Sequence, residues 1–539
     1  MRGFFFACVA LGSAVLGVIV ACTGEDLQPC TGPECVTAEA GAETASQSSI
    51  TVTIPKAPVV IQGSNTVVDV EVARSGFNGP ITIAVEGLPA DVSATAATIA
   101  PDATKASITI NATTAAAQGE TAITISGSDA TGSIKGSSPT QLLVRGPAGS
   151  LDVTFGNGGR MTVAGGASGF LVGGVVVQPD GKALVSGTID SDFVVIRFDA
   201  KGALDPSFGT TGRATTDFRI DGGVTSDYVG SVALAPNGSV ILSGYTVQPY
   251  SKYAVARFLA DGKRDNGFDG DGYAMFDYEG LDGDRFAHAV VVQPADGKIV
   301  FAGTIYNNAA GEQHDLVLAR VTEQGALDPT FDNDGFSTHA VATGSEDECA
   351  AVALDGQNIV CAGESNKRFV ALRVLANGGK DPAFAGGIAL VDFGADARAR
   401  SVNVLADRSV LLAGSAGTKI GVAQLSAAGT LVPGFGDAGK TTFDFGAASP
   451  LFGGAIVDAR GRLIVLGVTG TGNDIGLAAI KPDGKLDETW GTAGKVITPV
   501  VNNTTNLGYG PRLAQGPDGR IVVASRLESG ELVVLRYWN

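Results

Sequence analysis

The sequence has 539 residues, with 37 basic and 55 acidic side chains and a formal net charge of −18 at pH 7. This length exceeds the roughly 100–200 residues of a typical domain, so more than one domain is expected. An acidic surface repels phosphate backbones, and we expect no nucleic-acid partner. The 76 glycines have no three-residue period, which excludes collagen, and short runs of Val, Ile, Thr and Phe between turn residues predict an all-β protein.

The first 21 residues have the pattern of an export signal. Arg2 is followed by an apolar stretch over 4–20 and by the tetrapeptide IVAC at 19–22. That tetrapeptide resembles the lipobox of bacterial lipoproteins, whose cysteine is acylated and becomes the mature N-terminus. The resemblance implies lipidation of Cys22 and a membrane-anchored place in the cell envelope, periplasmic or surface-exposed. Thr23 mildly favours the outer membrane, because Asp there is the usual signal for inner-membrane retention. The alternatives are an uncleaved membrane anchor and an ordinary secretory signal.

Four other cysteines lie beyond the leader. Cys30 and Cys35 fall in the segment 22–48, and export permits a disulfide between them. Cys349 and Cys361 flank one predicted hairpin turn, where they are either a disulfide or two small buried apolar residues. No CxxC motif occurs, so a zinc site or a thioredoxin-like site has no support.

The next two segments differ sharply in pattern. Residues 22–48 are rich in Ala, Glu, Thr, Gly and Ser without apolar periodicity, which predicts a flexible tether. Residues 49–146 hold about seven short strand-like runs, a pattern that predicts an immunoglobulin-like β-sandwich. The runs FNGPITI at 77–83 and GLP at 87–89 resemble bacterial Ig-like modules of surface proteins. No cysteine occurs in 49–146, so the disulfide of antibody domains is absent.

Residues 150–539 contain one unit seven times. Each unit opens near a Leu-Asp pair that leads to an aromatic residue, and the aromatic recurs at Phe155, Phe208, Phe268, Phe331, Phe384, Phe435 and Trp490. A short strand, a hairpin and a further strand follow each aromatic, so every unit has four strands. Four-stranded units at this spacing predict propeller blades. The seventh unit finishes its last strand two residues before Asn539, which favours a closed ring over an open solenoid.

The repeated pattern resembles the delta-sixty repeat family, with the signature Leu-Asp-x-x-Phe-Gly-x-x-Gly. The resemblance covers about 390 residues, 150–539, and implies a β-propeller in a secreted bacterial protein. It implies no activity and no catalytic residues. Arg264 replaces Leu in the third copy, Ala385 replaces Gly in the fifth, and Val432 replaces Asp in the sixth.

Three further patterns in the sequence are candidate sites. Residues 434–441 (GFGDAGKT) fit the Walker A pattern, but sibling loops in other units lead into strands, whereas a phosphate-binding loop needs a helix. The acidic turns at 268–272 and 331–335 are candidate calcium ligands, although Asp, Asn and Gly also favour turns for backbone reasons. The three histidines (His288, His314 and His339) fall at different points of the repeat, and neither HExxH nor GxSxG occurs. We therefore predict no catalytic residue and no cofactor, with calcium as the exception left open.

The function expected from these patterns is binding. We predict a non-enzymatic, monomeric lipoprotein that presents a protein or glycan site on a propeller rim or in its central channel. The insertions 246–252 and 306–313, each between the third and fourth strands of its unit, are candidate contact regions. The alternative is an extracytoplasmic enzyme that acts on polysaccharide. A deep central pocket with two carboxyl groups roughly 5–10 Å apart would favour the enzyme, and a channel lined by backbone and small residues would favour binding.

Overall fold

The computed structural model describes residues 47–220, 223–247, 250–278, 284–307, 313–342, 344–446, 451–469, 474–500 and 512–539. The leader, Cys22, Cys30, Cys35 and most of the tether lie outside these residues. The described part consists of strands and turns, with one short 3-10 turn, η2 (Ala385–Gly387). It contains no helix that is long and apolar enough to cross a membrane.

Residues 49–145 form two packed β-sheets. One sheet has the order β1-β3-β7-β5 and the other has the order β2-β9-β8-β4-β6. The strands are β1 (Ser49–Thr53), β2 (Val59–Ile61), β3 (Asn65–Ser75), β4 (Ile81–Glu86), β5 (Val92–Ala94), β6 (Ala97–Ile99), β7 (Lys105–Ala112), β8 (Gly119–Asp129) and β9 (Lys135–Arg145). Buried residues alternate along strands such as β1 and β7, and those of both sheets form one apolar core.

The rest of the described chain forms seven four-stranded sheets, which we number as blades 1–7 in chain order. Blade 1 contains β11 (Leu171–Val177), β12 (Ala183–Ile189), β13 (Asp192–Phe198) and β14 (Arg213–Thr216). Blade 2 contains β17 (Ser226–Leu234), β18 (Val240–Val247), β19 (Ser251–Phe258) and β20 (Tyr273–Phe276). Blade 3 contains β21 (Arg285–Val292), β22 (Ile299–Asn307), β23 (Gln313–Val321) and β24 (Phe336–His339). A small hairpin of β15 (Arg219–Ile220) and β16 (Gly223–Val224) follows blade 1.

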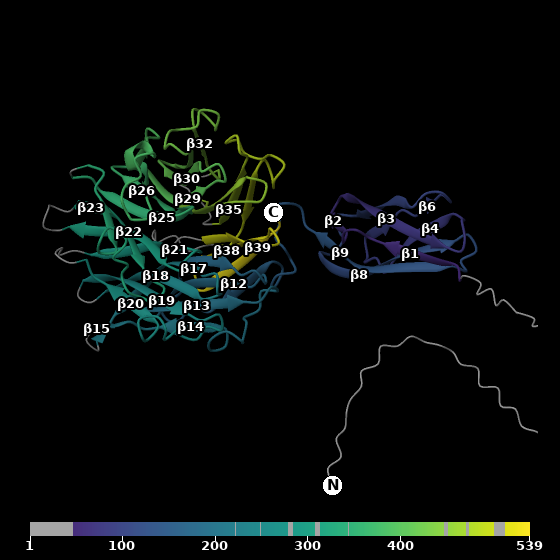
Figure 1. Ribbon diagram of the computed structural model, residues 1–539, viewed down its shortest axis with the longest axis horizontal. Helices are drawn as coiled ribbons and strands as arrows, with labels where there is room; N and C mark the ends of the chain where they lie inside the picture. The colour runs from purple at the N-terminus through teal and green to yellow at the C-terminus, as the bar shows by residue number, and fades with distance from the viewer. Residues whose placement is uncertain are drawn as a thin grey trace, which may run out of the picture.

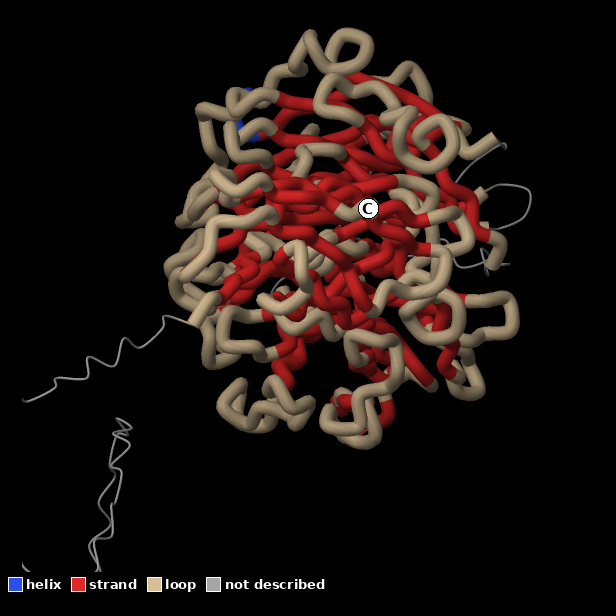
Figure 2. The backbone as a smooth tube through the Cα atoms, turned by 90° about the vertical axis from the view of Figure 1, so that its right-hand side faces the viewer, coloured by secondary structure: helices blue, strands red, loops and turns tan. Residues whose placement is uncertain are grey.

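Blades 4–7 repeat the arrangement. Blade 4 contains β25 (Asp347–Asp355), β26 (Asn358–Ser365), β27 (Arg368–Val374) and β28 (Ile388–Val391), and blade 5 contains β29 (Ala397–Val404), β30 (Val410–Ala416), β31 (Lys419–Leu425) and β32 (Lys440–Phe443). Blade 6 contains β33 (Leu451–Val457), β34 (Leu463–Val468), β35 (Ile475–Ile480) and β36 (Lys495–Thr498). Blade 7 contains β37 (Arg512–Gln515), β38 (Ile521–Arg526), β39 (Leu532–Tyr537) and β10 (Arg160–Val163). The sheets stand around a common centre (Figure 1), and strands make up much of the described chain (Figure 2).

The ring is closed by one strand from the other end of the array. β10, from the first repeat, pairs antiparallel with β39, from the last, so that Arg160 lies opposite Leu535. The pairing places blade 7 beside blade 1 and removes the exposed terminal faces of an open array. The predicted fold is confirmed: the protein is all-β with a seven-bladed β-propeller.

The sequence repeat and the blade are offset by one strand. The short strand after each aromatic pairs with the blade that precedes it, as β14 does with β13. The insertions 246–252 and 306–313 therefore lie between the second and third strands of blades 2 and 3. The described ends of each are strand, since β18 pairs with β19 out to Val247 and Ser251, and β22 pairs with β23 out to Asn307 and Gln313. Residues 248–249 and 308–312 of these candidate contact regions lie outside the described residues.

The repeated Asp of the Leu-Asp-x-x-Phe motif anchors each outer turn through a buried ion pair. In blade 3, Arg320 Nε lies 2.7 Å from Asp328 Oδ2, and its guanidinium stacks over Phe331 at 4.7 Å. Both charged residues are buried. Four other blades repeat the pair, as Arg197–Asp205, Arg257–Asp265, Arg373–Asp381 and Arg536–Asp152. In these five copies the motif thus couples the Asp to an arginine near the end of the third strand.

The sixth and seventh copies lack an arginine at this position of the third strand, and both still avoid an unpaired buried charge. Where the sixth copy has Val432 in place of Asp, Gln424 stands at the arginine position, so both charges are lost together. In the seventh copy Ala479 stands there, and Arg462, directly before β34, pairs with Asp487 at 2.8 Å. A buried charge is kept only with its partner, because an unpaired one is costly.

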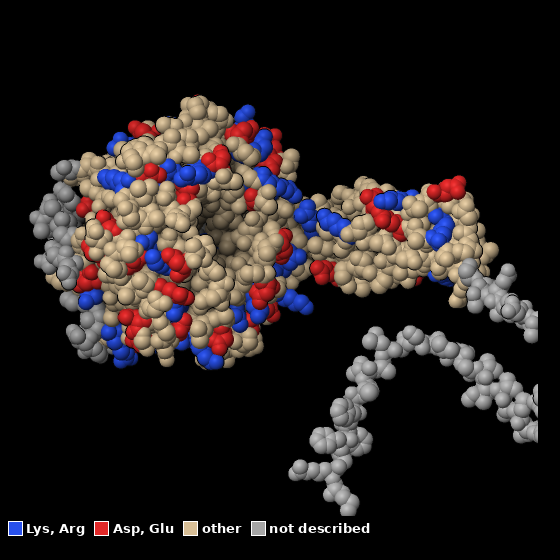
Figure 3. All heavy atoms as spheres, in the orientation of Figure 1, with Lys and Arg blue, Asp and Glu red and all other residues tan. Residues whose placement is uncertain are grey.

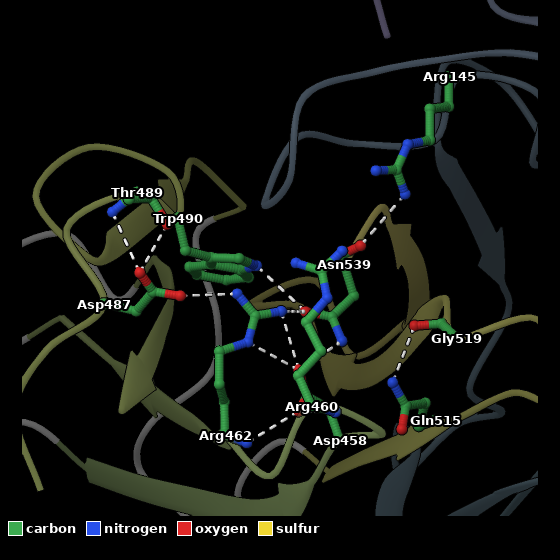
Figure 4. Close-up of polar contacts among 10 residues, drawn as sticks. All are labelled: Arg145, Asp458, Arg460, Arg462, Asp487, Thr489, Trp490, Gln515, Gly519 and Asn539. Carbon is green, nitrogen blue, oxygen red and sulfur yellow. Dashed lines mark hydrogen bonds and ion pairs between the residues drawn. The ribbon is translucent and has the colours of Figure 1, made fainter. Parts of the chain in front are cut away.

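Near the sandwich, the chain end joins several elements. Asn539 Oδ1 accepts hydrogen bonds from Arg462 and from Trp490 Nε1, and Arg145 reaches its backbone oxygen at 3.5 Å (Figure 4). Trp538 Nε1 donates to Gln118 Oε1 of the sandwich at 2.8 Å. These contacts attach the sandwich to the propeller beside blade 7 (Figure 1).

Candidate functional site

A central cavity of about 460 Å³ lies among the innermost strands of the seven blades. Its wall consists largely of Gly, Ala, Val and Ser, and the face in Figure 3 is hollowed at the centre of the propeller. A volume of this size lies within the ~300–1,000 Å³ of typical ligand pockets. The charged side chains that line it, Glu348, Arg400 and Arg512, therefore stand out from the wall.

A bulge in the innermost strand sets which side chains enter the channel. Each of six blades shifts register there, as between Ala287 and Ala289 in blade 3 and between Ala399 and Ser401 in blade 5. The extra residue lines the cavity, and it is Gly173, Gly230, His288, Ala350, Arg400 and Gly453 in blades 1–6. Blades 3 and 5 alone among these six put a large polar group at this point.

Glu348 of blade 4 lies between those two groups. Its Oε1 is 3.6 Å from His288 Nε2 and 3.5 Å from Arg400 Nη1, and its Oε2 is 3.5 Å from Arg398 Nε. Arg398 also pairs closely with Glu364. The cluster joins blades 3, 4 and 5 by charge.

Electrostatics keep Glu348 ionised. Burial acts to raise the pKa of Glu348, but the positive charges of His288, Arg400 and Arg398 outweigh it, and the pKa is lowered. Burial lowers the pKa of His288, which the arginines reinforce and Glu348 opposes. The site therefore holds a carboxylate beside the guanidinium groups of Arg398 and Arg400 and the imidazole of His288.

A second cavity, of about 190 Å³, adjoins this cluster between blades 3 and 4. His288 and Glu348 line both cavities. Aromatic rings continue from it along blades 3 and 2: His314 packs on Tyr306 at 3.8 Å, Tyr306 on Phe286 at 5.4 Å, and Phe286 on Tyr245 at 4.6 Å. We call this second cavity, lined by Phe286, His288, Thr304, Tyr306, His314, Glu346, Asp347, Glu348, Glu364 and Arg398, the side pocket.

Segments 178–208, 235–268 and 295–331 match the family model described as "Domain of unknown function (DUF5122) beta-propeller". Three repeats carry a propeller-family signature. The matched segments run from the turn before the second strand of blades 1–3 to Phe208, Phe268 and Phe331, which are the repeated aromatics. No curated protein matches the sequence.

Solved structures with some likeness to the chain are distant. Prolyl oligopeptidase B from Galerina marginata, as apo protein, is 9% identical with a TM-score of 0.34, and the match covers 76% of this chain and 54% of that one. The YadV chaperone is 10% identical with a TM-score of 0.17, covering 54% and 100%. Titin domains z1z2 in complex with telethonin are 16% identical with a TM-score of 0.13, covering 39% and 95%. This chain spans about half the length of the oligopeptidase, and nothing about activity follows from such loose overlap.

The structure shows which of the candidate residues from the sequence lie close together. It brings His288 and His314 together at the side pocket, although they occupy different points of the repeat. It pairs Cys349 with Cys361 as a disulfide between β25 and β26, with Cα atoms 5.8 Å apart. The Walker-like segment ends in β32, a strand, and Lys440 Nζ donates to the backbone oxygen of Asp392.

The acidic turns use their carboxylates locally. Asp271 Oδ1 accepts from Tyr273 N at 3.2 Å, and Asp334 Oδ1 accepts from Phe336 N at 2.9 Å. Elsewhere, Asp192, Asp217 and Asp227 place ligand atoms within 4.8 Å of one another, and they are the one such group among the described residues. Burial raises the pKa of Asp227, and the neighbouring Asp217 adds to this.

His339 lies apart from the channel and makes the stability depend on pH. Burial lowers its pKa to about 4, so below pH 6.5 the unfolded chain binds a proton that the folded protein does not. Stability is therefore expected to fall by about 2 kcal/mol as the pH drops from 6.5 to 4 and to level off below, since one pKa unit corresponds to ~1.4 kcal/mol and solvent contact reduces the effect.

Chemical denaturation of wild type and His339→Gln across this range measures that effect. The variant should lose the slope that the histidine contributes. A variant profile as steep as that of the wild type would exclude His339 as its source.

Proposed function

We propose that this protein is a non-enzymatic ligand-binding protein of the bacterial cell envelope, held to a membrane through Cys22. Its ligand binds where Glu348, His288, Arg398 and Arg400 meet at the channel. The observation that carries the proposal is this charged cluster in a wall made largely of small residues. Charged groups are costly to place at partly buried positions, and these four gather on blades 3–5 where the other blades carry mostly small residues, which supports a binding role.

The finer assignments of the other parts belong to the same proposal. We infer that the repeats are of the delta-sixty type, on the Leu-Asp-x-x-Phe-Gly motif and its arginine partner. We infer that residues 49–146 are an Ig-like module, which the parallel pairing of β2 with β9 and the two-sheet packing support. In this arrangement the tether and the module hold a monomeric propeller away from the membrane. No resident cofactor is part of the proposal.

Binding can be tested with the full-length protein extracted in detergent. We expect saturation-transfer NMR against a mixture of monosaccharides, amino acids and alkylamines to detect at least one compound with the wild type. Glu348→Gln and Arg400→Ala should reduce that signal at least tenfold, because charge-assisted hydrogen bonds are worth about 1.5–3 kcal/mol each. Ser231→Ala, which alters an uncharged channel position of blade 2, is the matched control. Signals that persist in both charge variants would refute the site.

Anchoring has a separate test. Cys22→Ala should move the protein from the membrane fraction to the soluble fraction, because the acyl chains supply the membrane affinity. Cys30→Ala, eight positions along the same segment, should leave it in the membrane. Membrane retention of Cys22→Ala would refute acylation at this residue.

The second candidate is an extracytoplasmic enzyme that acts on polysaccharide. The observation in its favour is Asp315, whose pKa is raised by burial and by the nearby charge of Asp347, as a general acid requires. Glu348, with its lowered pKa, fits a binding carboxylate better than an acid. New reducing ends from an alginate, xylan or chitin digest, lost in Asp315→Asn, would favour the enzyme.

A further inference from the structure

The side pocket contains two buried polar atoms that no described residue satisfies. Thr304 is 3% exposed and Asp347 is fully buried, yet Thr304 Oγ1 and Asp347 Oδ1 make no hydrogen bond. Both residues line the side pocket. An unsatisfied buried polar atom costs about 1–3 kcal/mol, and such a group in a native protein needs an explanation.

The same two positions are satisfied between blades 1 and 2. Thr188 matches Thr304 in register, since each lies opposite the residue two positions before the extra residue of the bulge, Leu171 and Phe286 respectively. The Thr188 Oγ1 donates to the Asp227 backbone oxygen and accepts from Val229 N. Asp227 matches Asp347, and both its carboxylate oxygens are bonded, Oδ1 by Thr225 and Oδ2 by Phe218 N.

At blade 4 the bonds are distributed differently. Asp347 Oδ2 accepts from both Val341 N and Ser345 Oγ, which leaves Oδ1 unused. The repeat can therefore satisfy these groups, and the boundary between blades 3 and 4 is built so that it does not. The free acceptors follow from the local arrangement, not from the fold in general.

Charge and shape indicate what would fill the pocket. Four carboxyl groups (Glu346, Asp347, Glu348 and Glu364) line it against one guanidinium (Arg398), an excess of three negative charges. The aromatic rings of Phe286 and Tyr306 form another part of the wall. Carboxylates and aromatic faces together favour an organic cation, through ion pairing and cation–π attraction.

Two further observations limit the kind of cation that the side pocket can bind. The volume of about 190 Å³ is smaller than a drug-sized pocket, so it fits one ring or a short chain. Its carboxylates are not among the described groups of three that gather within 4.8 Å, so they are too widely spread for a single metal ion. An ammonium group has three donors, which match Asp347 Oδ1, Thr304 Oγ1 and a glutamate.

We propose that the side pocket binds a primary organic ammonium group, such as an amino sugar or an alkylamine, with Asp347 and Thr304 as its acceptors. This rests on the proposed function, because it names the ligand class of the same channel site. A neutral sugar is the competing occupant, since its hydroxyls could also donate to these atoms.

The test compares pairs of probes that differ in charge, by isothermal titration calorimetry on the full-length protein in detergent. Butylamine is paired with 1-butanol, and glucosamine with glucose. The proposal requires butylamine or glucosamine to bind and the neutral member of its pair to bind at least tenfold more weakly. Equal binding of glucosamine and glucose would overturn the ammonium assignment, and so would no binding by either amine.

Variants locate the binding within the protein. Thr304→Val and Asp347→Asn should each weaken amine binding about tenfold or more. Thr188→Val, at the position whose hydroxyl is already bonded, should leave the affinity within twofold while it lowers stability. Asp347→Asn could disturb the turn that Val341 and Ser345 form, and Thr304→Val, which removes no protein bond, then decides. If Thr304→Val keeps full affinity, the pocket is not the site.

The two proposals fail separately. If the amines do not bind but another compound of the NMR mixture does, and depends on Glu348 and Arg400, the channel function stands and the ammonium assignment falls. If no compound depends on those residues, the proposed function falls as well.

Discussion

Arg320→Gln is expected to lower the free energy of unfolding by about 3–5 kcal/mol. The substitution leaves Asp328, which is 3% exposed, without its buried guanidinium partner. It also removes the hydrogen bond to the Ala376 backbone oxygen, the bond to Thr330 Oγ1 and the stacking over Phe331. Lys298 Nζ, 3.1 Å from Asp328, compensates only in part, because it is more exposed to solvent. Urea denaturation, followed by far-UV circular dichroism, measures the loss.

The matched control is taken from the protein itself. Arg320→Gln combined with Asp328→Val reproduces the Gln424 and Val432 of the sixth copy. We expect the double variant to recover at least half of the lost stability, because no charge is then left buried without a partner. A double variant that is less stable than the single one would show that the pair acts through something other than its charge.

Trp490→Ala is expected to cost about 3–5 kcal/mol, the range for removing a large buried aromatic. Trp490 is fully buried at the position that Phe occupies in the other six copies, and its Nε1 donates to Asn539 Oδ1 at 3.2 Å. The alanine leaves a cavity between blades 6 and 7, next to the seam that closes the ring. The loss is measured as the shift in denaturation midpoint, with a check that the slope is unchanged.

Trp490→Phe separates the ring from its hydrogen bond. It restores the aromatic of the other copies and loses one bond and some volume, so we expect a cost of about 1–2 kcal/mol. Equal costs for the phenylalanine and alanine variants would mean that the bond to Asn539, and not packing, holds this position.

The fold could be predicted from the sequence because the same motif and the same strand pattern occur in seven consecutive units. A single Leu-Asp-x-x-Phe motif says little, but its recurrence gave the number of units, and the hairpins within each gave the strands. The sequence did not predict that each blade is offset by one strand from the sequence repeat. The strand after each aromatic is a four-residue segment such as β14, which carries no mark of the neighbour with which it pairs.

The arginine partner of each Asp was also present in the sequence. Arg197, Arg257, Arg320, Arg373 and Arg536 each stand one residue before the end of a predicted strand. The joint change to Gln424 and Val432 was a visible hint that the positions interact. Alignment of the seven copies by their strand ends would have found this pair, because it is local to each unit.

The candidate site was not predictable in the same way. Glu348, Arg398 and Arg400 are ordinary charged residues in strands, and they meet only because blades 4 and 5 are neighbours around the ring. A comparison of the same position across the repeats could have indicated the site. His288 and Arg400 stand where blades 1, 2, 4 and 6 carry Gly or Ala, so the departures from the repeat mark the site.

The position of the sandwich has a mechanical consequence. The chain leaves the sandwich at Arg145 and soon enters β10, the strand that β39 holds in blade 7. Gln118 of the sandwich is bonded to Trp538, which directly follows β39. A pull on the sandwich therefore reaches both partners of the closing pair together and is shared between them. Load therefore enters the ring at its seam in blade 7, away from the site on blades 3–5.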